Sequence, residues 1–159
     1  MNIFEIIQND DQESLEQFVQ ENDLLDYIPP KPPTLNKQDE ILGNGAPLIS
    51  IAAFYSARNC FEYLQLNGAN FDISDHAGLK VVHFASMGGS DDICDIIDSI
   101  GADFTEITPN GQTCLHFACE YGHFSLVQRF LTRNFQIDAT TNQLMTPLHY
   151  ACLKEIQIL

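Results

Sequence analysis

Three histidines spaced by 33 residues are the first residues of this chain whose type and spacing could do chemistry. His83, His116 and His149 recur at that interval, and Cys119 and Cys152 follow the last two by three residues. A histidine and a cysteine three positions apart share one face of a helix, so such a set could ligate zinc. A zinc site must gather four ligands at one point, however, and the chain has no paired-cysteine CxxC spacing. The regular interval therefore favours a structural role for the histidines, and no metal is expected.

Other possible reactive groups also have simpler interpretations. Cys114 or Cys119 could pair with His116 as nucleophile and base, but a reactive thiol needs a lowered pKa and an oriented base in a cleft. The segment Gly43-Asn44-Gly45 is not followed by the Gly-Lys-Ser/Thr of a phosphate-binding loop. The acidic residues between Asp91 and Asp98 lack the alternating spacing and the glycine of a calcium loop, so they are interpreted as a solvated helix face. No catalytic residues and no cofactor are predicted.

The 33-residue interval belongs to a longer motif. Residues 111–123 read GQTCLHFACEYGH, and residues 146–152 read TPLHYAC in the same register. Thr146 can cap a helix, Pro147 suits the first helical position, and Gly122 can end the helix in a left-handed conformation. A turn and two short helices cannot bury their apolar face alone, so such units must stack on one another. This motif and period resemble those of the ankyrin repeat.

The resemblance implies an all-α fold: an ankyrin-repeat solenoid of stacked helix-turn-helix units with short turn or hairpin fingers. It implies that each motif histidine forms hydrogen bonds to the backbone of a neighbouring turn. The residues assigned this structural role are His83, Thr113, His116, Thr146, Pro147 and His149.

The chain divides into three predicted parts. Residues 1–28 are expected to form a capping pair of helices, and residues 29–42 a proline-rich insertion or linker. Residues 43–159 are expected to hold the ankyrin repeats, at about 43–74, 75–107, 108–140 and an incomplete 141–159. The run from Pro29 to Pro33 is either a ligand for SH3 or WW domains or a stiff spacer. Because the last unit lacks an outer helix, we expect that the native chain continues or that this unit frays or associates.

Helix ends give an independent check on the register. Asn22, Gly68, Gly101 and Asn134 are predicted to adopt the left-handed conformation that ends a helix, which glycine and asparagine favour. In the second unit, Asp98 occupies the position of a leucine in the third, and it is expected at the edge of the core because a buried carboxylate is costly.

Composition narrows the class of partner. The formal charge is −15, from 22 acidic and seven basic residues, which argues against binding to nucleic acid or to anionic membranes. No apolar run approaches the roughly 18 residues that span a bilayer. The five cysteines are an odd number, and the N-terminus lacks the features of a signal peptide, so reduced thiols are expected. We expect a cytoplasmic protein, with the nucleus as the alternative.

The predicted function is binding of another protein, without catalysis and without a small-molecule ligand. The alternative is a regulatory or targeting portion of a larger protein that carries an enzyme, channel or ligase component. The resemblance places partner-binding residues at inner-helix ends and finger tips, namely Phe54, Tyr55, His76, Met87, Asn110, Glu120, Tyr121, Asn142, Gln143, Leu153 and Lys154, with Asn44 as a further finger tip. Of these, Phe54 and Met87 could instead pack between repeats. Tyr55 and Tyr121 occupy equivalent positions two repeats apart.

Overall fold

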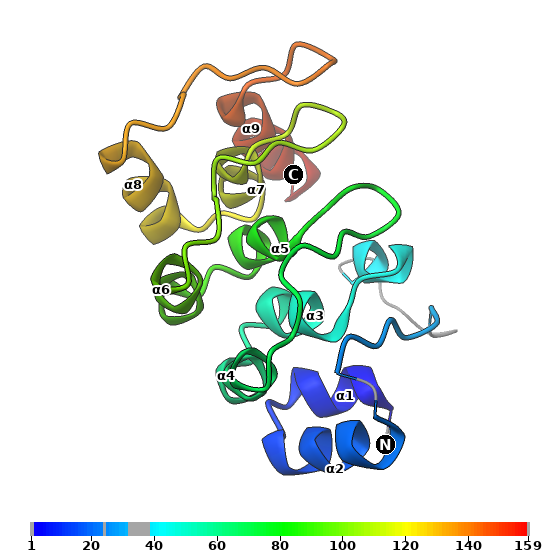
Figure 1. Ribbon diagram of the computed structural model, residues 1–159. Coiled ribbons are helices and arrows are strands. Elements are labelled where there is room, and N and C mark those ends of the chain that lie inside the picture. Colours follow the sequence, from blue (N-terminus) through cyan, green and yellow to red (C-terminus); the bar gives the residue numbers. More distant parts are fainter. Residues whose placement is uncertain (1, 24, 32–38, 159) are drawn as a thin grey trace.

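The computed structural model describes residues 2–23, 25–31 and 39–158, in which every regular element is a helix (Figure 1). The expected all-α class is confirmed. In chain order the elements are α1 (Ile3–Gln8), α2 (Gln12–Asn22), the 3-10 helix η1 (Glu40–Asn44), α3 (Leu48–Phe54), α4 (Arg58–Leu66), α5 (Val81–Gly88), α6 (Asp91–Ser99), α7 (Cys114–Glu120), α8 (Phe124–Thr132) and α9 (Pro147–Ile158). None of the helices in these ranges is long and apolar enough to cross a membrane.

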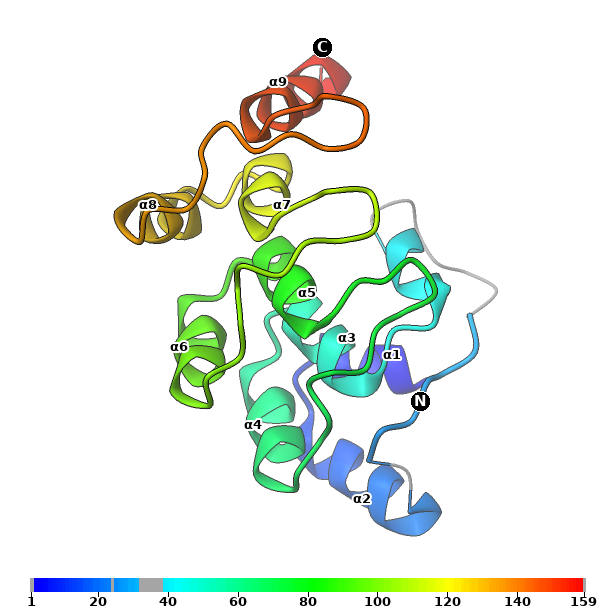
Figure 2. The ribbon, with the colours of Figure 1, turned by 45° about the horizontal axis from the view of Figure 1, so that its top comes forward.

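The helices form two parallel rows. In Figures 1 and 2 the odd-numbered helices make an inner row and the even-numbered helices an outer row. Along the inner row α1 packs on α3, α3 on α5, α5 on α7 and α7 on α9, and along the outer row α2 packs on α4 and α4 on α6. Each unit therefore buries its apolar face against its neighbours, as stacking of incomplete units requires.

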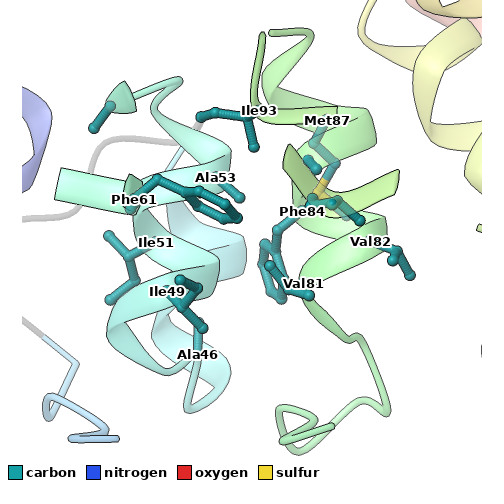
Figure 3. Close-up of a cluster of buried hydrophobic side chains, with 14 of the residues drawn as sticks. Ala46, Ile49, Ile51, Ala53, Phe61, Val81, Val82, Phe84, Met87 and Ile93 are labelled. Atoms are coloured by element: carbon teal, nitrogen blue, oxygen red, sulfur yellow. The ribbon is translucent and has the colours of Figure 1, made fainter. Parts of the chain in front are cut away.

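The core lies between successive units and extends along the stack. Ala52, Ala85 and Ala118 recur in the inner helices and are at most 1% exposed, and their small side chains let these helices approach closely. Larger side chains fill the space between inner and outer rows, as Figure 3 shows for Phe61 of α4 and Phe84 of α5. Both faces of an inner helix are buried in this way, so α5 is buried from Val81 to Met87.

Three of the four predicted helix ends have the expected left-handed conformation. Gly68, Gly101 and Asn134 have φ values of +90°, +77° and +60°. The prediction for Asn22 is wrong by one residue, because Asn22 is the last residue of α2 and Asp23 adopts the left-handed conformation with φ +53°. The Asn22 side chain instead donates a hydrogen bond to the carbonyl of Phe18, which favours its place inside the last turn.

A finger precedes each of the last three inner helices and projects to the same side (Figure 2). Its tip is a turn at residues 75–79, 108–112 and 141–145. In all three turns the first N–H donates to the fifth carbonyl, at 2.9, 2.9 and 3.0 Å. The first side chain is a buried aspartate or threonine, whose oxygen accepts the fifth N–H at 2.8, 3.1 and 3.3 Å. These buried acceptors fix one turn shape through the array.

The fourth position of the finger turn has a positive φ in every unit. Gly78 and Gly111 have φ +81° and +80°, whereas Leu144 adopts φ +60° with a side chain 77% exposed. The left-handed conformation is unfavourable for leucine by about 1–2 kcal/mol of conformational free energy, whereas glycine adopts it without this cost. At Gly78 the neighbouring finger also leaves no room, since an added Cβ would lie 2.6 Å from the ring of Pro109.

The N-terminal helix pair is joined to the array by a carboxylate. Asp10, between α1 and α2, accepts hydrogen bonds from the N–H groups of Asn59 and Cys60 at 3.1 and 2.9 Å. These N–H groups lie in the first turn of α4, where Ala57 at the N-cap has no side-chain acceptor. Asp10 thus caps a helix of the next unit and interacts favourably with its dipole.

The segment after α2 also packs on the array. The carbonyl of Tyr27 accepts the N–H of Leu48 at 3.2 Å, and Asp26 accepts the N–H of Asn70 at 2.8 Å. Pro29 is buried and Pro30 is exposed, whereas Pro32 and Pro33 fall within residues 32–38, which lie outside the described residues. The choice between ligand and spacer, like the boundaries at residues 28 and 42, therefore stays a prediction.

Candidate functional site

The motif histidines connect one unit to the next through both ring nitrogens. His116 is fully buried; its Nδ1 accepts the N–H of Thr113 at 3.0 Å, and its Nε2 lies 3.0 Å from the carbonyl of Met145 in the next finger. An Nδ1 that accepts leaves the proton on Nε2, which donates to the carbonyl. Desolvation lowers the pKa of His116 and favours this neutral form.

The same pattern occurs one unit earlier, and half of it one unit later. His83 accepts the N–H of Lys80 at 2.9 Å and contacts the carbonyl of Glu106 at 3.1 Å. His149 accepts the N–H of Thr146 at 3.0 Å, but its ring is exposed. Pro147 is buried at the start of α9. Since the first two rings have both nitrogens engaged by backbone, they have no free lone pair for a metal.

An aromatic patch forms where inner helices of non-adjacent units end. We define it as Phe54, Tyr55 and Tyr121. The ring centroids of Phe54 lie 5.4 Å from Tyr55 and 6.1 Å from Tyr121, with edge-to-face geometry in both pairs. All three side chains are partly exposed and rest on the core. Partly exposed aromatic clusters on a rigid scaffold have the composition of protein-binding hot spots.

Gly88 explains how Phe54 reaches Tyr121 across the unit between them. It occupies the position equivalent to Tyr55 and Tyr121, and a Cβ there would lie 2.1 Å from the carbonyl oxygen of Ala53. The absent side chain lets α5 approach the end of α3 closely. The sequence contained this signal, because a glycine stands between two tyrosines in the 33-residue register.

Two carboxylates and one ammonium border the aromatic patch. The hydroxyl of Tyr55 donates a hydrogen bond to Asp39, and burial together with this carboxylate raises the Tyr55 pKa. Burial raises the pKa of Tyr121 to about 12, with smaller contributions from Glu120 and Asp39. The ammonium of Lys154 lies 5.3 Å from the Tyr121 ring centroid. Sequence reasoning missed Asp39, because its position beside the patch depends on the path of the insertion.

Met87 is a correction to the predicted binding residues. Its side chain is 2% exposed and points into the cluster that contains Phe84 and Ile93 (Figure 3). It shares a register position with Phe54 and Glu120, but the close approach of α5 at Gly88 encloses it. Met87 is therefore a core residue that a partner could not reach.

The predicted finger-tip residues are exposed, and some also hold neighbouring fingers together. The N–H of His76 donates to the carbonyl of Asn44, and the N–H of Asn142 to that of Asn110, both at 2.9 Å. The Asn142 amide donates to Pro109 at 3.0 Å. Gln143 is exposed, and on α9 so are Leu153, at 46%, and Lys154. At the tips, the side chains of His76, Asn110 and Gln143 are exposed.

A network of ion pairs on the outer row explains why a carboxylate is tolerated at position 98. Its carboxylate lies 2.8 Å from the guanidinium of Arg133 and also contacts Arg129, which reaches Asp95 at 2.6 Å. Its side chain is 26% exposed, at the edge of the core as expected. Arg133 and Arg129 lower the Asp98 pKa against the opposing effect of burial. The pairing could have been predicted, since both arginines lie one unit ahead and flank the equivalent of Asp98.

Most of the described basic side chains are paired with carboxylates. Among the described bases, Lys31, Arg58, Lys80, Arg129 and Arg133 each lie within 4.0 Å of a carboxylate. In the same part of the chain no group of three or more histidine, cysteine or acidic side chains is arranged to hold a metal ion. The chemical character that stands out is the aromatic patch and its border.

Comparison with known proteins agrees with this architecture. A model of ankyrin repeats in three copies matches residues 82–159. The chain is 33% identical over 112 residues to a probable E3 ubiquitin-protein ligase, XBOS33, of Oryza sativa subsp. japonica; the match covers 68% of this chain and 21% of that protein. It is 26% identical over 87 residues to the tyrosine-protein kinase HTK16 of Hydra vulgaris, covering 54% of this chain and 12% of that one. The chain thus spans only 21% and 12% of the length of these two relatives, and by its motif, its stacked helix pairs and the family match it is an ankyrin-repeat protein.

Proposed function

We propose that this chain is a non-catalytic interaction module that binds a partner protein through the aromatic patch and the adjoining finger tips. The observation that carries the proposal is the patch itself. Three rings from two non-adjacent units meet at the surface, although aromatic side chains gain most by full burial. Rigid aromatic side chains lose little conformational entropy when a partner covers them, which suits them to this role.

The charges support a protein partner over a nucleic acid. Binding to phosphates depends on available lysine and arginine, and the described bases outside the patch are already paired with carboxylates. The buried free thiols of Cys60, Cys94 and Cys114 support a reducing compartment, and we propose the cytoplasm or, alternatively, the nucleus.

The direct test is affinity capture from the native cell, followed by cross-linking mass spectrometry, with wild-type protein and the double variant Tyr55→Ala/Tyr121→Ala. We expect the double variant to lose partners that the wild type retains, with affinity weakened by about 2 kcal/mol or more. The control is Phe124→Ala, because Phe124 is 74% exposed at the start of the outer helix α8. Equal recovery with all three proteins would place the interface elsewhere.

Stability must be measured alongside. Substitution of partly exposed tyrosines should change the free energy of unfolding by no more than about 1 kcal/mol. A larger loss would assign both rings to the core and remove the basis of the proposal.

The second candidate function is a regulatory or targeting region of a larger protein. It is favoured by the two relatives, in which the matched region is 21% of a probable ubiquitin ligase and 12% of a tyrosine kinase. Intact mass measurement of the native protein tests it. A mass near 17.8 kDa would reject this candidate, and a much larger mass would support it.

A further inference from the structure

Lys154 shows what kind of group the aromatic patch accepts. Its ammonium lies over the Tyr121 ring, 5.3 Å from the centroid, within the range in which a ring face attracts a cation. Lys154 is exposed, and its long flexible stem can move aside at little cost. The chain thus provides its own example of a cation bound at this surface.

Two carboxylates add negative charge at the border of the patch. Asp39 accepts the hydroxyl of Tyr55 and acts on Tyr121, and Glu120 precedes Tyr121 and interacts with Lys154. Aromatic faces flanked by carboxylates attract a cation through both the ring quadrupole and the charge. An anionic group at the same place would meet repulsion from both carboxylates.

The whole-chain charge acts in the same direction. With 22 acidic residues against seven basic ones, the field of the protein draws in cationic segments and slows the approach of acidic ones. Most of the described bases are already paired with carboxylates, as Arg129 and Arg133 are with Asp98.

We propose that the aromatic patch binds a lysine or arginine side chain from a basic segment of the partner protein, between Asp39 and Glu120 and in the place of Lys154. The proposal rests on the proposed function, since it assigns the chemistry of the partner at that same surface. It predicts a basic peptide as the ligand, and it makes Lys154 a competing internal cation.

The probe is a fluorescein-labelled peptide of about ten residues with three lysines among glycine and serine, measured by fluorescence anisotropy. Its twin carries norleucine in place of each lysine, which keeps the apolar stem and removes the charge. We expect the lysine peptide to bind at least about tenfold more tightly than its twin. Tyr121→Ala should lower that affinity by about tenfold, whereas Tyr121→Phe, which keeps the ring, should retain most of it.

Two further variants distinguish binding at the aromatic patch from attraction of the peptide by the net negative charge of the protein. Lys154→Met should strengthen binding more than Arg58→Met, which removes the same charge from the outer helix α4. Equal gains from both would show that bulk charge alone attracts the peptide, and that result would overturn the proposal. Equal affinity for the norleucine twin, or no effect of Tyr121→Ala in a protein that remains folded, would also overturn it.

Failure here is distinguishable from failure of the proposed function. If a cellular partner is lost with Tyr55→Ala/Tyr121→Ala but the lysine peptide binds no better than its twin, the patch is an interface for another chemistry. If the lysine peptide depends on Tyr121 and no partner depends on the tyrosines, the cation site stands and the proposed function is wrong.

Discussion

The third and fourth units share one motif and differ in what covers it. Thr113 and Thr146 make the same hydrogen bonds to the histidine three residues later, at 3.0 Å from backbone N–H to Nδ1 in both. Leu115 is nevertheless 1% exposed, whereas the equivalent Leu148 is 71% exposed. The cap geometry is encoded within the motif. Burial is conferred by the neighbouring helix, because α9 covers α7 and no described helix covers α9 in the same way.

The largest difference between these units should appear on removal of the motif leucine. Leu115→Ala leaves a cavity between α7 and its neighbours and should cost about 2–5 kcal/mol of unfolding free energy. Leu148→Ala, at the same register position, should cost less than about 1 kcal/mol because its side chain is already solvated. Urea unfolding followed by circular dichroism measures both. Similar losses would mean that another surface covers α9 in solution.

Removal of the motif histidine should give the next largest effect. His116→Ala leaves the N–H of Thr113 without an acceptor and removes one of the two donors to the carbonyl of Met145, which still accepts the N–H of Thr141, and it should cost about 1–3 kcal/mol. His149→Ala should cost less, since water can reach the groups that its exposed ring leaves behind. Urea denaturation gives the two values, and elemental analysis supplies the control. Tight stoichiometric zinc in the wild type would contradict the structural role.

A substitution in the finger turn should raise the free energy of unfolding rather than lower it. Leu144→Gly should raise the unfolding free energy by up to about 1 kcal/mol, because it removes a left-handed leucine that contributes little packing. Gly111→Ala at the equivalent position should lower it by about 1 kcal/mol or more, since φ is +80° and a Cβ would lie 3.2 Å from the Cα of Thr141. Thermal unfolding measures the change in unfolding free energy of both variants. Two changes of the same sign would refute the turn assignment.

A pH dependence provides the smallest test. Burial lowers the folded-state pKa of His83 and His116, so the unfolded chain binds their protons first as pH falls below about 6.5. Their contribution to stability is complete above that pH and is lost progressively below it, down to the folded-state pKa. The difference in unfolding free energy between wild type and His116→Ala should therefore shrink from pH 7.5 to pH 5. A constant difference would show that His116 does not remain neutral in the fold.

Local features were the most predictable from sequence. The 33-residue register predicted the helix pairs and the left-handed ends at Gly68, Gly101 and Asn134, because one or two residues determine each of them. Asn22 was misplaced by one position, since a longer α2 uses the asparagine side chain inside its last turn. Ends without glycine depend more on such side-chain alternatives.

Contacts between units were harder to predict. Met87 is buried although its register equivalent Glu120 is partly exposed, because the glycine at position 88 draws α5 against α3. Asp39 reaches Tyr55 only through the path of an insertion that has no counterpart in the other units. Such contacts depend on how elements far apart in sequence approach one another, and the repeat pattern carries little information about that.

Hydrogen exchange tests most directly the claim that stacking, rather than the motif, stabilises each unit. We predict that amides of residues 115–120 in α7 exchange near the limit of global unfolding, whereas those of residues 148–154 in α9 exchange far faster despite the same cap. The experiment requires a protein shown to be monomeric by light scattering. Equal protection of the two helices in that monomer would contradict the account.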